Sequence, residues 1–263
     1  MTKLTPELTH RYGPRVHLLN DPFLSGLLAR LCSAATTQPS INHLVQLLYQ
    51  QLLISVLGAE FPVVNVLSET RMSTLHPGVL LESRQIEKTQ RAIVVNLARA
   101  GTFPSHICYE NLHYALNYEG IRQDHIFAAR MTSQDGKVTE TDLGSSKIGG
   151  DKQGAIVLFP DPMGATGHTI ISAIRHYKDK VAGQAQKMIA LHLIVTPEYL
   201  RNVLHTDPDV IVYAIRLDRG LSSQAVLETI PGTDWVHEKG LNEHDYIVPG
   251  GGGFGEIMNN SFV

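Results

Sequence analysis

The sequence predicts an α/β fold with a mostly parallel central sheet flanked by helices. Short apolar, β-branched segments alternate along the chain with segments of helical periodicity, the order expected of parallel strands joined by helices. The chain has 263 residues, of which 43% are hydrophobic, enough to bury one substantial core. No internal repeat, linker or low-complexity tract divides it. We therefore expect a single domain over residues 1–263.

The expected elements follow one another in a regular order. Residues 1–60 form an N-terminal helical arm, in which Ser40 caps a helix whose apolar stripe belongs to the core or to a subunit contact. The stripe comprises Leu44, Leu47, Leu48, Leu52 and Val56. Buried strands are predicted at 92–98, 124–129, 155–159, 188–195 and 210–215. Helices are predicted at 105–116, 167–177 and 197–204.

Residues 131–153 break this pattern. The segment is polar, rich in Gly, Ser, Thr and Asp, and has no sustained apolar period. Such a composition is typical of an exposed hairpin or a mobile loop. Taken alone, the segment predicts one of these two surface structures.

The most informative segment is 157–170, where an apolar strand leads through a tight turn into a new helix. A helix start offers unpaired backbone N–H groups and the positive end of the helix dipole, which together favour a phosphate. Two glycines in the turn let the backbone approach that phosphate, and two threonines add hydroxyl donors. These residues are Gly164, Gly167, Thr166 and Thr169.

Asp161 follows the strand directly and lies where a carboxylate can reach ribose hydroxyls, either directly or through a magnesium ion. The turn lacks the Gly-Lys-Ser/Thr ending of a Walker loop and the spacing of Gly-x-Gly-x-x-Gly. Turns with Asp-Pro and Gly are also common in loops without a ligand. The turn alone therefore leaves a phosphate site and an ordinary loop both open.

Four motifs together resolve this choice. The turn reads Asp161-Pro-Met, one further residue, then Ala-Thr-Gly; residues 240–250 contain Leu-Asn-Glu-His and then Tyr-Ile-Val-Pro-Gly. Residues 93–101 end in Arg-Ala-Gly, and residues 208–210 read Pro-Asp-Val before a strand. In this order the motifs resemble those of the uracil phosphoribosyltransferase family of type I phosphoribosyltransferases. The resemblance extends along most of the chain and is weakest before residue 60 and across two insertions.

The resemblance implies a type I phosphoribosyltransferase fold with a flexible hood loop at 131–153 and a small C-terminal base-binding hood at 240–263. It implies transfer of a phosphoribosyl group from 5-phosphoribosyl-1-pyrophosphate (PRPP) to uracil, giving UMP and pyrophosphate in pyrimidine salvage. Mg²⁺ would be bound mainly through PRPP, with no metal site built from protein ligands alone. The enzyme would thus be a glycosyltransferase.

The same resemblance assigns the PRPP site. The catalytic residues would be Asp161 and Arg99, and Lys147 in the hood would reach the pyrophosphate. For Arg99 and Arg130 the plainer alternative is a surface salt bridge. The implied PRPP-binding residues are Arg99, Arg130, Asp161, Pro162, Met163, Gly164, Ala165, Thr166, Gly167, His168, Thr169 and Gly253.

By resemblance, the uracil-binding residues lie in the glycine-rich loop 246–256. Uracil presents an acceptor, a donor and an acceptor along one edge, and a backbone supplies the matching N–H, C=O and N–H without side chains. Phe254 would also offer a ring near the base. The implied residues are Tyr246, Ile247, Gly252, Gly253 and Phe254.

The chain departs from the family most clearly in this uracil-binding loop. The family usually reads Pro-Gly-x-Gly-Asp-x-Gly-Asp, whereas Gly253 replaces the first aspartate here and Glu256 the second. Gly164 and His168 also replace more usual residues; the former relaxes the turn, and the latter offers a phosphate contact. Loss of a carboxylate beside the ribose leaves two alternatives to a uracil enzyme: a non-catalytic nucleotide-binding or regulatory protein, and a phosphoribosyltransferase for another base.

The remaining features limit the partners. A net charge of −3 offers no basic surface for nucleic acid, and no apolar run is long enough to span a membrane. Two cysteines and no targeting pattern predict a soluble cytoplasmic protein, and thirteen histidines without a ligand spacing do not predict a zinc site. The family implies a homodimer or homotetramer. The insertion 221–239, with Trp235, would cover the site, contact another subunit or elaborate the surface.

Overall fold

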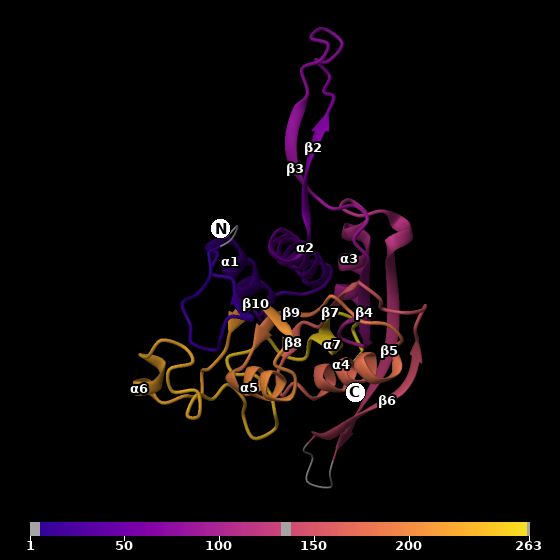
Figure 1. Cartoon of the computed structure of the whole chain (residues 1–263). Helices are drawn as coiled ribbons and strands as arrows, with labels where there is room; N and C mark the ends of the chain where they lie inside the picture. Colours follow the sequence, from indigo (N-terminus) through magenta and orange to yellow (C-terminus); the bar gives the residue numbers. More distant parts are fainter. Residues whose placement is uncertain (1–5, 133–137, 262–263) are drawn as a thin grey trace.

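The protein is built around an eight-stranded sheet, described here from a computed structural model (Figure 1). The backbone is described for residues 6–132 and 138–261, and the side chains for the same residues except 128–132 and 138–144. The strand order is β1-β10-β9-β7-β4-β5-β6, with the two-residue β8 pairing beside β9. Every pairing is parallel except that of β5 with β6. The predicted fold class, a mostly parallel sheet flanked by helices, is confirmed.

The five predicted strands are all present and form the centre of the sheet. They are β4 (Ala92–Ala98), β5 (Ile121–Thr132), β7 (Ile156–Pro160), β9 (Lys187–Val195) and β10 (Ile211–Leu217). The additional strands are β1 (Val16–Leu18), β6 (Val138–Lys147) and β8 (Met163–Gly164). Parallel strands buried on both faces read as continuous apolar runs, which is why the sequence locates them well.

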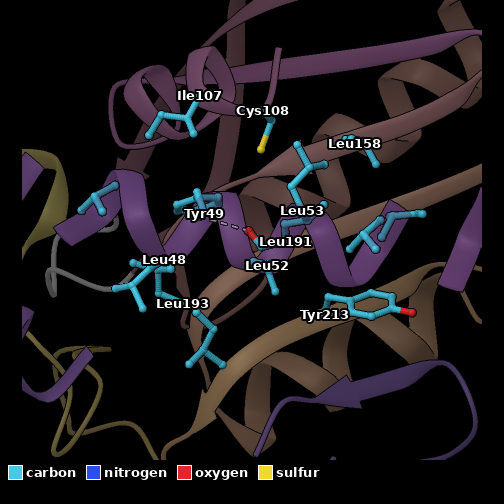
Figure 2. Close-up of a cluster of buried hydrophobic side chains, with 14 of the residues drawn as sticks. Leu48, Tyr49, Leu52, Leu53, Ile107, Cys108, Leu158, Leu191, Leu193 and Tyr213 are labelled. Atoms are coloured by element: carbon cyan, nitrogen blue, oxygen red, sulfur yellow. Dashed lines mark hydrogen bonds between the residues drawn. The ribbon is translucent and has the colours of Figure 1, made fainter. Parts of the chain in front are cut away.

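Side chains alternate between two cores, one on each face of the sheet. One face packs against α1 (Pro22–Leu31), α2 (Ser40–Glu60) and α3 (Thr102–Leu112), and Figure 2 shows the buried side chains of α2 against those of β9. The Tyr49 hydroxyl donates to the Leu191 carbonyl there, at 3.2 Å. The other face packs against α4 (His168–Lys180) and α5 (Pro197–Thr206). The α2 stripe therefore belongs to the core.

Two helix starts differ from the sequence prediction. Pro39 is the N-cap of α2, so Ser40 is the first residue of the helix and not its cap. Helix α3 begins at Thr102, earlier than expected, because Gly101 ends the loop after β4 and passes directly into the helix. A short 3-10 helix, η1 (Tyr118–Gly120), then leads into β5.

A long hairpin projects from the body between α2 and β4 (Figure 1). It consists of β2 (Val63–Ser68) and β3 (Leu81–Ile86), paired in antiparallel register from Val63 with Ile86 to Ser68 with Leu81. The sequence pattern predicts no element in this region. Half-exposed strands with polar and apolar residues on both faces give only a weak periodic signal.

The polar segment 131–153 contributes a strand. Residues of β6 pair with β5, with register shifts between Phe127 and Ala128 and between Met131 and Thr132. The structure therefore supports the hairpin of the two surface alternatives, and residues 133–137 at its turn lie outside the described residues.

The insertion 221–239 packs against the chain's own body. Its short helix α6 (Gln224–Leu227) is followed by Trp235, whose indole N–H donates to the Pro197 carbonyl of α5 at 2.8 Å. The buried Glu238 carboxylate accepts from Tyr12 and from Arg219, the latter at 3.0 Å. These contacts make it a structural part of the domain.

Candidate active site

The predicted phosphate turn, residues 161–169, lies at the carboxyl edge of the sheet, between β7 and the start of α4. Ligands of open α/β sheets bind at this edge. Asp161 follows β7, and its Oδ1 accepts the Met163 N–H at 3.1 Å, which folds the chain into the turn. Gly167 has a φ of 89° and is the N-cap of α4, and no side chain caps that helix. The first N–H groups of α4 therefore point towards the turn without a side-chain acceptor.

Both glycines of the turn serve packing beneath it. A Cβ on Gly164 would lie 2.9 Å from Val195 Cγ1 and 3.1 Å from the Tyr199 ring, so its absence permits contact with β9 and α5. A Cβ on Gly167 would lie 2.9 Å from Val203 Cγ2. That their missing side chains let the backbone approach a phosphate, and that Gly164 relaxes the turn, stay predictions. The space lies on the core side, and Gly167 also supplies the left-handed conformation.

Buried polar groups hold the turn from below. His192 Nδ1 donates to the Asp161 carbonyl at 2.6 Å, and its Nε2 accepts from the Tyr199 hydroxyl at 2.5 Å. These partners define the tautomer, and complete burial lowers the pKa of His192 to about 4, so the ring is neutral at physiological pH. Thr196 also donates to the Ala165 carbonyl, at 2.7 Å. Sequence reasoning missed these supports because they contact the turn only in the folded chain.

A small cavity of about 50 Å³ opens above the turn. Its lining joins the turn to the loop that precedes the glycine-rich segment, since both Asp161 and Asp245 belong to it. The predicted residues among its walls are Asp161, Met163, Ala165, Thr166, Gly167, His168 and Thr169. Pro162 is buried beneath, where its carbonyl accepts two N–H groups of β9.

The chemistry of this cavity fits a magnesium ion held mainly by substrate. Mg²⁺ usually takes one or two carboxylates together with phosphate oxygens and water. Asp161 and Asp245 are the carboxylates that line the cavity. Within residues 6–132 and 138–261, no group of three or more His, Cys, Asp or Glu side chains forms a metal cage.

Arg99 lies at the same edge, directly after β4, the neighbour of β7. Its Nη2 donates to Glu256 Oε1 at 3.1 Å, and its Nη1 donates to the carbonyl and hydroxyl of Ser261 at 3.2 and 3.1 Å. The guanidinium is therefore already held by the C-terminal segment. Both side chains of the ion pair stay about one-third exposed, 38% and 33%, and remain open to an incoming ligand.

Arg130 and Lys147 lie on the hairpin formed by β5 and β6. Arg130 pairs with Thr141 and comes three residues after Phe127, the partner of Ala98, so its backbone extends beyond the carboxyl edge. The Arg130 side chain is outside the described side chains. Lys147 pairs with His125 at the other end of β6 and is exposed.

The glycine-rich loop lies beside Arg99 and ends in α7 (Phe254–Ile257). Ile247 and Phe254 are buried, whereas Tyr246 is 61% exposed. The Phe254 ring packs in the core below Gly251 and is 1% exposed, so the expectation of a ring offered to a base is not met. Gly252 has a φ of 81°, and nothing lies within 4 Å of its absent Cβ. The open side of the loop is thus at Gly252.

Gly253 and Glu256 are directly coupled. A Cβ at Gly253 would overlap Glu256 Oε2, so the absence of a side chain at Gly253 makes room for the Glu256 carboxylate. Neither residue lines the cavity above the phosphate turn. The structure therefore forms two clusters at one edge of the sheet, the turn with Asp245 and Arg99 with Glu256.

Comparisons with known proteins identify the family of this chain. A family model described as uracil phosphoribosyltransferase matches residues 18–234 and ends before the glycine-rich loop. The uracil phosphoribosyltransferase of Campylobacter fetus is 30% identical over 128 residues, 49% of this chain and 50% of that protein. That of Agrobacterium fabrum is 32% identical over 103 residues, 39% of this chain and 38% of that protein. The chain thus spans half or less of the length of these relatives.

A solved structure shows the same fold over nearly the whole chain. The AQ2163 protein from Aquifex aeolicus superposes with a TM-score of 0.69 at 18% identity, covering 92% of this chain and 97% of the other. The mostly parallel sheet flanked by helices, together with the family match, makes this a type I phosphoribosyltransferase fold. Since the family model covers most of the sequence, the chain belongs to the uracil phosphoribosyltransferase family.

Proposed function

We propose that this protein transfers the phosphoribosyl group of PRPP to uracil, giving UMP and pyrophosphate, as a step of pyrimidine salvage. The observation that carries the proposal is the cavity shared by the phosphate turn and Asp245, which directly precedes the base loop, the glycine-rich residues 246–256. One nucleotide can span the two because its phosphate and its base lie at opposite ends of a ribose.

In the proposed reaction a bond forms between a ring nitrogen of uracil and the anomeric carbon of PRPP. The bond from that carbon to pyrophosphate breaks, and the electron pair leaves with the pyrophosphate. Positive charge develops on the ribose and negative charge on the leaving group, so the protein needs cations near the latter and a fixed 5-phosphate. Mg²⁺, when bound with PRPP, would neutralise part of the pyrophosphate charge.

The residues are proposed to divide this work. The N–H groups at the start of α4 and the hydroxyls of Thr166 and Thr169 hold the 5-phosphate, while Asp161 faces the ribose. Arg99 contacts the pyrophosphate after exchanging Glu256 for phosphate oxygens, a charge-assisted contact of the same kind. Arg130 and Lys147 on the β5–β6 hairpin, which would cover PRPP, add further cations.

A second candidate function deserves a test because of one observation. Glu256 pairs with Arg99, and no carboxylate replaces the aspartate that relatives carry at Gly253. This arrangement favours a protein that binds the nucleotide without turning PRPP over, and a different base remains the third alternative.

The experiment is a UMP-formation assay with PRPP and Mg²⁺, in which uracil is compared with cytosine, adenine and hypoxanthine. UMP formed from uracil alone supports the proposal. If another base yields the product, the substrate assignment is wrong. If none does while UMP still binds, the protein is a nucleotide-binding member of the family.

We propose that this protein works in the cytoplasm as a homodimer or homotetramer. The projecting β2–β3 hairpin carries exposed apolar side chains that another subunit would cover. Cys32 and Cys108 are unpaired, in keeping with a reducing compartment. In the described part of the chain, no helix combines the length and the apolar character that a membrane crossing requires.

A further inference from the structure

Arg216 and Asp218 form an ion pair at the end of β10, next to the glycine-rich loop. Arg216 Nε donates to Asp218 Oδ1 at 2.6 Å and Arg216 Nη2 donates to Asp218 Oδ2 at 2.8 Å. This two-point contact fixes the orientation of the guanidinium and of the carboxylate. The Asp218 side chain is 2% exposed, and its backbone N–H donates to the Val195 carbonyl of β9 at 2.8 Å. The pair is therefore a rigid extension of the sheet.

This pair holds Gly250 by both of its backbone groups. The Gly250 N–H donates to Asp218 Oδ2 at 2.8 Å, and the Gly250 carbonyl accepts from Arg216 Nη2 at 2.7 Å. Gly250 has a φ of 63°, and a Cβ there would overlap the Ile247 carbonyl. The chain direction at this point is thus set by the ion pair and by a turn that only glycine permits.

On either side of Gly250, some backbone N–H and C=O groups of the loop are hydrogen-bonded and others are not. The Val248 N–H donates to the Gly240 carbonyl at 2.8 Å, and the Val248 carbonyl accepts from Gly220 at 3.1 Å. Within the described chain, the backbone groups of Ile247, Gly251 and Gly252 have no hydrogen-bond partner. Two of these positions, Ile247 and Gly252, are among those that the family resemblance assigns to uracil.

We propose that Arg216 and Asp218 are positioning residues for the base: they clamp Gly250 so that the N–H and C=O groups of Ile247, Gly251 and Gly252 face one planar heterocycle. Such backbone groups would recognise a 2,4-dioxopyrimidine, whose edge alternates acceptor, donor and acceptor. This inference rests on the proposed function. Neither side chain touches the base, so the pair acts through Gly250.

The test compares kinetic constants of Asp218→Asn and Arg216→Lys with those of the wild type. Either change breaks the two-point contact and loosens Gly250, so we expect the KM for uracil to rise about tenfold while the KM for PRPP stays within about twofold. Glu238→Gln is the matched control, because it weakens the neighbouring buried Arg219 pair, which does not contact the loop. Its KM for uracil should be unchanged. Equal rises in both KM values, or no rise, would overturn the proposal.

A measurement on the wild-type protein tests the proposal even if the variants fail to fold. Amide hydrogen exchange should show the Gly250 N–H protected without ligand, and the Gly251 and Gly252 N–H groups protected only after UMP is added. An unprotected Gly250 in the free protein would refute the clamp. If Gly250 is protected but uracil and UMP never bind, the clamp stands and the proposed function fails.

Discussion

Single residues decide how this member of the family differs from its relatives, and Gly253 is the sharpest case. The sequence alone identifies a missing carboxylate there. The structure adds that the Glu256 carboxylate lies where a side chain at Gly253 would begin, and that it pairs with Arg99. The missing side chain at Gly253 and the ion pair of Glu256 with Arg99 therefore depend on each other.

This coupling predicts that Gly253→Asp alone lowers kcat/KM for PRPP. The new side chain would displace the Glu256 carboxylate from Arg99 and place two carboxylates together. The double variant Gly253→Asp with Glu256→Ala should regain activity relative to the single one. A single variant that equals or exceeds the wild type would show that the two positions do not interfere.

His192 predicts a pH dependence of stability. Its pKa falls from 6.5 to about 4 on burial, so between these values the unfolded chain takes up a proton that the folded chain does not. The free energy of unfolding therefore decreases as pH falls from about 6.5 to about 4, by roughly 3 kcal/mol for this group. Denaturant unfolding of the wild type and of His192→Gln over this range tests it. The variant's curve should be flatter, and parallel curves would contradict the account.

At the level of elements, buried parallel strands were predictable and surface elements were not. The strand expected at 92–98 matches β4 residue for residue, because a strand buried on both faces carries a continuous apolar run. The hairpin of β2 and β3 has no such run, since its side chains contact little of the body. The support of the phosphate turn by His192 and Tyr199 was also hidden, because it depends on the pairing of distant segments.

The β2–β3 hairpin yields a prediction about assembly. Near its turn, Leu75 is 70% and Val79 is 68% exposed, an unfavourable state for a free monomer. We expect a dimer or tetramer in analytical ultracentrifugation, and a shift towards monomer in the variant Leu75→Ser with Val79→Ser. Tyr118→Ser, which removes an exposed aromatic side chain outside the hairpin, is the control and should leave the assembly unchanged. A wild-type protein that is monomeric at all concentrations would refute the subunit contact.

At the scale of the whole molecule, the topology explains why motifs far apart in sequence meet. The loops after β4, β7 and β10 all leave the carboxyl edge of one sheet, which gathers Arg99, the phosphate turn and the base loop. The motifs indicated that these segments belong to one site. They did not indicate that Arg99 would face Glu256, because that contact depends on how the C-terminal segment returns to the sheet.

The central claim is that the phosphate turn and the base loop form one site for a single nucleotide, and UMP binding measured by calorimetry tests it most directly. We predict one UMP per chain, with affinity reduced both by Thr166→Val in the turn and by Gly252→Ala in the loop, whose φ of 81° disfavours a side chain. If either variant bound UMP as tightly as the wild type while folding normally, the two segments would not share a ligand.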